Sequence, residues 1–458
     1  MTTADPVRTG APERTPAALP DPPVPTGDFR ADSAALTGFA ERGEEVLAGL
    51  GPKPDRSPEQ QARADAVHRS CRWLRARFMA AHATGLYDEL TVGRTVPLRI
   101  GELAEAAADR VPGLVPDKAQ LAAEAAGPQA HKEGREIDQA IFFRAVLSRP
   151  GPGAHLLESM RRPTARALSL LPEFRRQGSV DLGAVRVARR EGVAYVTLAN
   201  THCLNAEDNG LTVDLETAVD LALLDDDVRV GALRGAEMTH PRYAGRRVFS
   251  AGINLKHLHQ GLISYVDFLL GRELGYISKL VRGLVPEDGP AAWPNLSVQK
   301  PWAAGVDAFA IGGGMQLLLV LDRVVAGADA WFSLPAAQEG IVPGAGNLRL
   351  TRITGARTAR RVLLGGQRLR ASSAEGLLIC DEVVEPQDVG AALERGAAEL
   401  AADAVVGNRR MLHVAEEPEE AFRGYMAEFA FTQGLRLYSE DVLAKVGRSW
   451  SGTDGVRG

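Results

Sequence analysis

This 458-residue chain has few cysteines and few aromatic residues, and it has no excess of positive charge. The cysteines, Cys71, Cys203 and Cys380, are odd in number and far apart, which excludes a disulfide framework and a CxxC zinc site. This use of cysteine favours a reducing cytoplasm. Lys and Arg total 53 against 58 Asp and Glu, so the net charge of −5 gives no general attraction to nucleic acid or to an anionic membrane.

Long hydrophobic runs are also missing. The apolar run from Ala308 to Leu321 contains three glycines and a glutamine and is too short for the ~20 apolar residues that span a bilayer. Residues 1–30 contain seven prolines and lack the apolar centre of a signal peptide. We therefore expect a disordered leader over 1–30 and no membrane contact.

The chain is 45% hydrophobic, which is ample for a core, and its first half has helical patterns. We predict a helical N-terminal domain over 31–178. In the segment that starts at Ser57, Pro58 suits the first helical position and Ser57 the N-cap, and apolar residues recur at helical spacing from Val67 to Ala81. Further helices are expected at 100–112, 117–126, 134–148 and 155–172.

The pattern changes near residue 180, where β-branched residues alternate with polar ones. VDLGAVRVARR and VAYVTLAN predict two strands joined by a turn at Glu191-Gly192. A helix, a strand and a second strand–strand–helix series follow, which indicates an α/β core over 179–360. A mostly helical insert is expected over 255–295. We expect a helical C-terminal region over 361–458, with one strand in CDEVVEP.

Two glycine-containing turns in the core are candidates for chemistry, at 248–255 and 311–317. In the second, a strand turns through three glycines into a helix, which leaves backbone N–H groups able to bind an anion or a developing oxyanion. Close packing of strand and helix would require the same small residues, so the glycines alone leave both interpretations open. GxGxxG, the dinucleotide fingerprint, does not occur there.

Taken together, FSAGINL, AIGGGMQL and SLPAAQEGIVPGAGNLRL resemble the enoyl-CoA hydratase/isomerase (crotonase) superfamily over roughly 180–400. The resemblance implies an α/β spiral of ββα units. It also implies that the amide N–H groups of Ile253 and Gly313 form an oxyanion hole for an acyl-CoA thioester. Leu204-Asn205-Ala206 resembles the family segment that lies along the CoA and acyl group.

This chain departs from the hydratases at the positions of their acid and base. Those enzymes have glutamates where Gln316 and Ala336 stand here, and neither an amide nor a methyl group can move a proton as hydration requires. Glu339 lies three residues after Ala336, and we interpret it as a structural carboxylate. An oxyanion hole without this pair suits a substrate with an acidic α-carbon, such as an arylacetyl-CoA.

The helical N-terminal half, the insert and Gln316 together resemble a dioxygenase branch of the superfamily. That branch converts (3,5-dihydroxyphenyl)acetyl-CoA and O₂ to the aryl glyoxylate and free CoA, without metal or organic cofactor, for glycopeptide antibiotics. The resemblance implies that Glu207 and Arg272 lie near the ring hydroxyls and that Gln316 lines the acyl pocket. From the sequence pattern alone, Glu207 would be a solvated loop acid, and Arg272 would be exposed, since it lies off the apolar stripe of its helix.

The remaining candidates surround the two turns. Basic residues near the first turn are expected to meet the CoA phosphates or to form an ordinary charged loop: Arg234, His240, Arg242, Arg246, Arg247 and Lys256. Turn residues expected to contact the substrate are Ala251, Gly252, Asn254 and Gly314. His257 and His259 do not predict a metal site, because residues two apart on a helix face different directions and no third ligand is nearby.

The resemblance further implies a homo-oligomer, a trimer or a hexamer made of trimers. Two alternative functions stay open from the sequence. One is a crotonase-fold hydrolase or isomerase that acts on another acyl-CoA without O₂. The other is a non-catalytic scaffold or an RNA-binding relative, against which the net negative charge argues.

Overall fold

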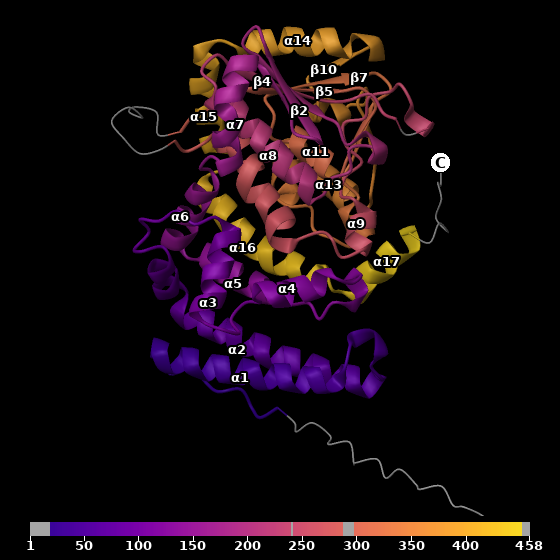
Figure 1. Ribbon diagram of the computed structural model, residues 1–458. Coiled ribbons are helices and arrows are strands. Elements are labelled where there is room, and N and C mark those ends of the chain that lie inside the picture. The colour runs from indigo at the N-terminus through magenta and orange to yellow at the C-terminus, as the bar shows by residue number, and fades with distance from the viewer. Residues whose placement is uncertain (1–18, 240, 287–296, 451–458) are drawn as a thin grey trace, which may run out of the picture.

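The computed structural model describes residues 19–239, 241–286 and 297–450 of the chain. Two β-sheets and their covering helices form one end of the molecule, and the N-terminal helices form a layer at the other end (Figure 1). The yellow C-terminal helix α16 (Glu419–Arg436) runs along the boundary between these two parts (Figure 1).

From residue 19 onward, seven α-helices precede the first strand: α1 (Phe29–Leu50), α2 (Pro58–Leu90), α3 (Ile100–Arg110), α4 (Lys118–Ala125), α5 (Glu136–Ser148), α6 (Pro150–Met160) and α7 (Ala165–Gln177). The predicted start of α2 is confirmed. The Ser57 hydroxyl accepts the backbone N–H of Gln60, and the Gln60 side chain accepts the backbone N–H of Ser57, which together satisfy two helix-end donors.

Two expectations for this half are wrong. The helix expected over 155–172 is two helices, α6 and α7, because Pro163 disfavours helical backbone before it and Thr164 caps a new start by accepting the Ala167 N–H. The leader expected over 1–30 ends early, since α1 begins at Phe29 with Asp28 as its N-cap. Residues 1–18 of that leader lie outside the described part of the chain.

The larger sheet has the strand order β1-β2-β3-β4-β5-β7-β10. Its strands are β1 (Ser179–Asp181), β2 (Val185–Arg190), β3 (Val193–Leu198), β4 (Val230–Gly235), β5 (Trp302–Val306), β7 (Arg323–Gly327) and β10 (Glu382–Val384). Pairing is antiparallel from β1 to β3 and parallel from β3 to β10. The smaller sheet contains β6 (Phe309–Ile311), β8 (Trp331–Ser333) and β9 (Leu369–Arg370).

The first strand prediction needs correction. The stretch expected to hold two strands forms three, because the chain reverses at Gly183 before β2 starts. Gly183 has a φ of 106°, a backbone angle that glycine adopts without steric cost. The turn at Glu191-Gly192 is confirmed, with φ values of 50° and 78° that match a tight hairpin.

The expected core boundary at residue 360 is also wrong. It falls inside α13 (Gly346–Leu363), and β9 and β10 beyond it belong to the two sheets. The strand expected in CDEVVEP is confirmed as β10, which pairs in parallel with β7. The final helices are α14 (Val389–Leu400), which packs on β4, β5 and β7, then α15 (Asp403–Glu416), α16 and α17 (Glu440–Trp450).

The helices between the strands cover and connect the sheets. They are α8 (Asn209–Leu224), α9 (Leu255–His259), α10 (Ser278–Arg282), α11 (Gly313–Leu318) and α12 (Ala336–Glu339). Between α9 and α10, the insert forms two wide π-helical turns, Tyr265–Leu270 and Glu273–Ile277. The insert is therefore helical as expected up to Arg282, while the end of its expected range, 287–296, lies outside the described residues.

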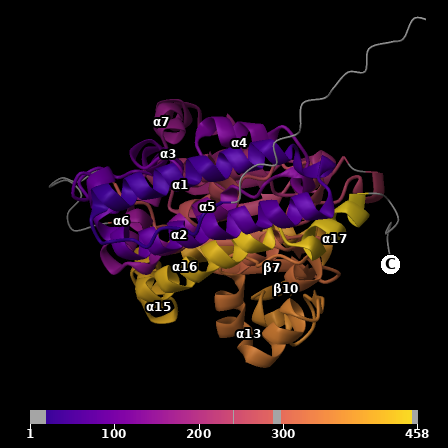
Figure 2. The same ribbon diagram turned by 90° about the horizontal axis from the view of Figure 1, so that it is seen from below.

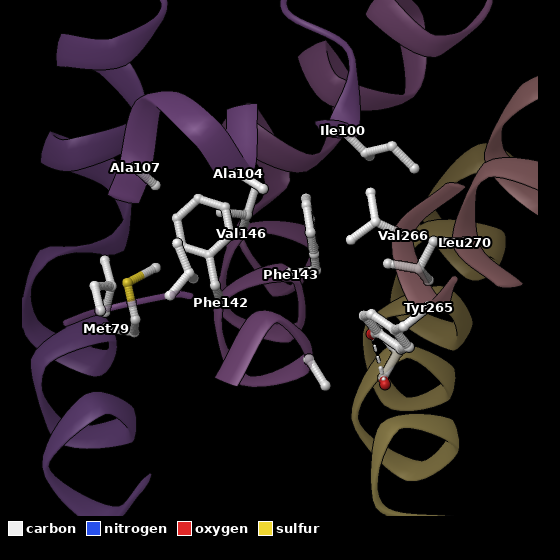
Figure 3. Close-up of a cluster of buried hydrophobic side chains, with 14 of the residues drawn as sticks. Met79, Ile100, Ala104, Ala107, Phe142, Phe143, Val146, Tyr265, Val266 and Leu270 are labelled. Carbon is white, nitrogen blue, oxygen red and sulfur yellow. Dashed lines mark hydrogen bonds between the residues drawn. The ribbon is translucent and has the colours of Figure 1, made fainter. Parts of the chain in front are cut away.

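The N-terminal helices do not have a core of their own. Met79, Phe142 and Phe143 belong to the same buried cluster as Tyr265 and Val266 of the insert (Figure 3). The hydroxyl of Tyr265 donates to the backbone carbonyl of Ala430 in α16 at 2.8 Å. Helix α16 packs along α5, and the view from below shows it running in the same direction as the N-terminal helices (Figure 2). The helical half, the insert and the C-terminal helix thus stabilise one another, since burying their apolar surface requires all three.

A buried ion network also ties the two halves together. Lys279 of α10 bonds to Asp220 and Glu216 of α8 at 2.6 and 2.8 Å, and Glu216 accepts a hydrogen bond from Arg99 at the start of α3. In the described ranges, no helix has both the length and the apolar character needed to cross a bilayer.

Candidate active site

The two glycine turns lie side by side. Ser250 and Ala310 form a parallel β-bridge, and the Ile311 N–H donates to the Ser250 carbonyl at 2.9 Å. Gly252 and Gly312 have φ values of 85° and 54°, which glycine adopts without steric cost. A Cβ on Gly312 would lie 3.2 Å from the Gly252 Cα and 4.0 Å from the Ile253 nitrogen. The glycines therefore allow the two backbones to approach closely.

The expected oxyanion donors share one cavity. Ile253 and Gly313 both line a cavity of about 50 Å³, and Gly313 is the first residue of α11, where an N–H has no partner within the helix. Over the ranges that the structure describes, neither amide N–H donates to a protein acceptor. Each of these two residues borders the cavity and has an N–H without a protein acceptor in the described ranges, while their role in a reaction stays a prediction.

Glu207 and Arg272 meet inside this cavity. Their side chains are 3% and 5% exposed, and the Arg272 Nε donates to the Glu207 Oε2 at 2.6 Å. Arg272 also donates to the Gln316 Oε1 at 3.0 Å and to the Gly313 carbonyl at 2.7 Å. Although burial disfavours the guanidinium charge, the nearby Glu207 carboxylate keeps the pKa of Arg272 above its ordinary value.

The exposure expected for these two residues from the sequence pattern is wrong. Arg272 lies between the two π-helical turns, and Gly275 has non-helical backbone angles, so the 3.6-residue period that placed Arg272 outside does not apply. Glu207 is buried because its backbone pairs with the first turn: its N–H donates to the Gly252 carbonyl, and its carbonyl accepts the Asn254 N–H. The structure thus brings both side chains to the cavity, while their expected position near the ring hydroxyls stays a prediction.

The loop before Glu207 follows the first turn. Leu204 and Asn205 have φ values of 57° and 54°, and the Leu204 carbonyl accepts the Ala251 N–H at 3.0 Å. The Asn205 side-chain amide donates to the Val248 carbonyl at 2.8 Å. The loop is therefore held rigidly against the first turn, next to the cavity.

Gln316, Ala336 and Glu339 also line the cavity. Across the described chain, no hydrogen bond or ion pair of the Glu339 carboxyl group is found, and burial raises its pKa to about 7. A structural carboxylate would hold a partner, so the expectation of a structural role for Glu339 is not supported.

Several other candidates lie away from the cavity. Arg234 on β4 forms an ion pair with Asp307 and packs beside Gly390 of α14. Arg246 pairs with Asp329, and Arg247 pairs with Glu237. The expected phosphate contact of Arg234 therefore lacks support from its position. His240 lies outside the described residues.

The neighbouring turn residues have local structural roles. Asn254 caps α9 by accepting the His257 N–H, and a Cβ on Gly314 would lie 2.6 Å from the Ser250 Cβ. Ala251 and Gly252 are likewise not among the residues that line the cavity. These four residues shape the turns, and their expected contact with the substrate stays a prediction.

No metal-binding cluster of three His, Cys, Asp or Glu residues occurs in the described ranges. His257 forms an ion pair with Asp208 through its Nδ1 at 3.0 Å. Sequence reasoning missed several residues that line the cavity, among them Phe268, Glu273 and Phe429. Glu273 is buried between Arg272 and Arg349. Phe429 comes from α16 and lies more than a hundred residues after Gln316 along the chain. No local pattern marks either of them.

Comparisons with known proteins place this chain in a family. The enoyl-CoA hydratase/isomerase family model matches residues 287–417. The chain is 57% identical to (3,5-dihydroxyphenyl)acetyl-CoA 1,2-dioxygenase of Amycolatopsis orientalis over 416 residues, which are 91% of this chain and 95% of that protein. It is 33% identical to a probable enoyl-CoA hydratase of Rhizobium meliloti over 42% of this chain and 66% of the relative.

A solved enoyl-CoA hydratase from Mycobacterium avium subsp. paratuberculosis aligns with 58% of this chain and 99% of its own, with 20% identity and a TM-score of 0.48. The R. meliloti relative thus matches only part of the chain, whereas the A. orientalis relative matches nearly all of it. This chain belongs to the enoyl-CoA hydratase/isomerase (crotonase) superfamily and, within it, to the family of the A. orientalis (3,5-dihydroxyphenyl)acetyl-CoA 1,2-dioxygenase.

Proposed function

We propose that this protein is a dioxygenase that converts (3,5-dihydroxyphenyl)acetyl-CoA and O₂ to 3,5-dihydroxyphenylglyoxylate and free CoA. One observation carries the proposal: the 57% identity to a dioxygenase of that name extends over nearly the full length of both chains. An alignment of this length includes the insert as well as the core, and the insert supplies Phe268 and Arg272 to the cavity.

The first chemical step is formation of a thioester enolate. The thioester oxygen accepts hydrogen bonds from the N–H groups of Ile253 and Gly313, which strengthen as negative charge develops there. Loss of one such donor typically costs about 2.7–4 kcal/mol of transition-state stabilisation. The proximity of the two amides on one cavity wall supports this arrangement.

The enolate then supplies the electrons that reduce O₂, so the proposal includes no metal and no organic cofactor. A C–O bond forms at the α-carbon, and the resulting peroxide attacks the thioester carbonyl and expels CoA thiolate. Cleavage of the O–O bond, with loss of the second α-hydrogen, gives the aryl glyoxylate. Both oxygen atoms of O₂ enter the product. The apolar walls of Phe268, Leu269 and Phe429 would exclude water that could reprotonate the enolate.

Recognition of the ring is assigned to Glu207, Arg272 and Gln316. A buried carboxylate accepts hydrogen bonds from phenol groups, and the guanidinium and amide beside it supply further polar contacts. The product would serve as a precursor of 3,5-dihydroxyphenylglycine, in keeping with the glycopeptide antibiotic role implied by the sequence resemblance. Acyl-CoA chemistry and three free thiols are consistent with a cytoplasmic location.

The reaction is tested by incubating metal-free protein with (3,5-dihydroxyphenyl)acetyl-CoA while O₂ uptake and thiol release are followed. The dioxygenase consumes one O₂ for each CoA released. CoA release without O₂ uptake would instead indicate a hydrolase. An unchanged substrate would favour the scaffold alternative, for which no observation of this structure argues.

We further propose that the protein forms a homo-oligomer, a trimer or a hexamer. Support comes from a cavity of about 660 Å³ between α13, α15 and β7, whose lining includes the exposed apolar side chains of Ile353, Leu377, Leu378 and Leu412. Exposed apolar patches of this kind are typical of protein–protein interfaces. Sedimentation of the wild-type protein and of Leu412→Glu tests this, since a charge at an interface should dissociate the assembly, and a monomeric wild type would exclude it.

A further inference from the structure

Three carboxylates line the cavity that holds the Ile253 and Gly313 amides, and they differ in their partners. Glu207 is paired with Arg272 and accepts a hydrogen bond from Ser250. Glu273 is paired with Arg272 and Arg349. Glu339 has neither a hydrogen bond nor an ion pair within the described residues. Only the third carboxylate of this set is therefore available to take up a proton.

The local fold explains why Glu339 has no partner. Glu339 is the last residue of the short helix α12, which ends because Gly340 adopts a left-handed conformation with a φ of 85°. The nearby cations are engaged elsewhere: Arg436 donates to the Gly340 carbonyl and pairs with Asp441, and Lys445 donates to the Ala337 carbonyl. Nothing in this arrangement holds the Glu339 carboxylate in its ionised form.

Burial of the Glu339 carboxyl group raises its pKa to about 7. A general base works best when its pKa lies near the working pH, because it is then ionised often enough and still binds a proton well. The positions at which hydratases keep their glutamates hold Gln316 and Ala336 here, so neither can serve.

We propose that Glu339 is the general base that removes the α-proton of the arylacetyl thioester. This inference rests on the proposed function. A carboxylate oxygen of Glu339 binds the proton, the C–H bond breaks, and its electron pair becomes the enolate whose oxygen is held by the Ile253 and Gly313 N–H groups. Glu339 is thus a catalytic residue that the sequence pattern did not assign.

The stoichiometry requires the base to act twice. The α-carbon of the substrate carries two hydrogens and the glyoxylate carbonyl carbon carries none, so two C–H bonds break in each turnover. The first proton passes from Glu339 to the departing CoA thiolate, which leaves as the thiol. Glu339 then takes the second proton as the O–O bond breaks, and it returns that proton to solvent when the product leaves.

The test is α-proton exchange without O₂. Wild type, Glu339→Gln, Glu339→Asp and the control Glu394→Gln, which changes an exposed glutamate on α14, are incubated with the substrate in D₂O under anaerobic conditions. Deuterium at the α-carbon is followed by mass spectrometry. We expect Glu339→Gln to slow both exchange and aerobic turnover by about 10²–10⁴-fold. Glu339→Asp should recover part of both rates, and Glu394→Gln should equal wild type.

Two further measurements separate a chemical role from a structural one. Glu339→Gln should bind a non-reactive amide analogue of the substrate as tightly as wild type does and should melt at an equal or higher temperature, since Gln carries no charge to desolvate. In wild type, kcat/KM should fall as the pH drops below about 7, because Glu339 becomes protonated. The residual kcat/KM of Glu339→Gln should not show this fall.

The two proposals fail in different ways. If wild type takes up no O₂ with the arylacetyl-CoA, the proposed function is wrong. If wild type does take up O₂ and Glu339→Gln still exchanges the α-proton at the wild-type rate, only the role of Glu339 is overturned. Weakened analogue binding in proportion to the lost rate would also overturn it, because that result would make Glu339 a binding residue.

Discussion

The Nε of Arg272 and the Oε2 of Glu207 lie 2.6 Å apart, in an ion pair that is almost completely closed to solvent. Arg272 comes from the helical insert and Glu207 from the loop before α8, so the pair joins the insert to the core beside Gly313. A buried pair contributes little net stability when intact, but removing one partner leaves a charge unsolvated. Variants of this pair therefore need a stability measurement together with an activity measurement.

Glu207→Leu should destabilise the protein and weaken its selection for a hydroxylated ring. Loss of Glu207 leaves the buried Arg272 with Glu273 as its remaining carboxylate partner, which is expected to lower the free energy of unfolding by up to about 3–5 kcal/mol in a urea titration. The double variant Glu207→Leu/Arg272→Met, which removes both charges, should regain part of this loss. The ratio of kcat/KM for dihydroxyphenylacetyl-CoA and phenylacetyl-CoA should fall. An unchanged ratio would remove Glu207 from ring recognition.

Gly313→Ala should impair catalysis while leaving the amide N–H in place. The added Cβ would lie 2.3–2.5 Å from the carboxyl atoms of Glu207, so either Glu207 or α11 must move. We expect turnover to fall by about 10²-fold, the loss typical of a disturbed oxyanion hole. The matched control is Gly407→Ala, where a Cβ meets nothing within 4 Å on helix α15; this variant should keep its activity and gain slightly in stability.

Acid should weaken the contact between α10, α13 and Glu417. Burial disfavours the charge of Glu417, yet Arg349 and Arg282 hold its pKa at about 2. Because the pKa is lower in the folded than in the unfolded protein, this stabilisation is complete above pH 4.5 and is lost as the pH falls toward 2. Glu417→Gln should lower the free energy of unfolding at pH 7 by ~3 kcal/mol and flatten its pH dependence between pH 4.5 and 2. A variant with the same slope as wild type in this range would contradict the assignment.

Removal of metal ions should leave turnover unchanged. If the substrate enolate itself reduces O₂, dialysis against EDTA and against phenanthroline should alter neither the rate of O₂ uptake nor the yield of CoA. Metal analysis of the dialysed protein is the required control. Activity that is lost on dialysis and restored by one added metal ion would show that the proposed cofactor-free reaction is incorrect.

Much of the fold could be predicted because its signals are local. The start of α2 is fixed by Ser57 and Gln60, and the β2–β3 turn by Glu191-Gly192, since caps and tight turns depend on residues that are adjacent in sequence. The helix break at Pro163 was missed, although Thr164 after it is a good N-cap residue. The boundary at 360 failed for a different reason, because strand pairing between β7 and β10 joins residues far apart in the chain.

The amino-acid sequence by itself determined the two glycine turns, the loss of the hydratase glutamates and the family, because these depend on residue type at fixed short spacings. Only the tertiary structure decided that Arg272 is buried and pairs with Glu207 and Glu273. It also decided that Glu339 lines the same cavity without a partner among the residues that the structure describes. The physical reason is that the charge state and reactivity of a side chain depend on the solvent and charges around it. Those surroundings are supplied by the π-helical insert, α12 and α16, which meet only when the chain has folded.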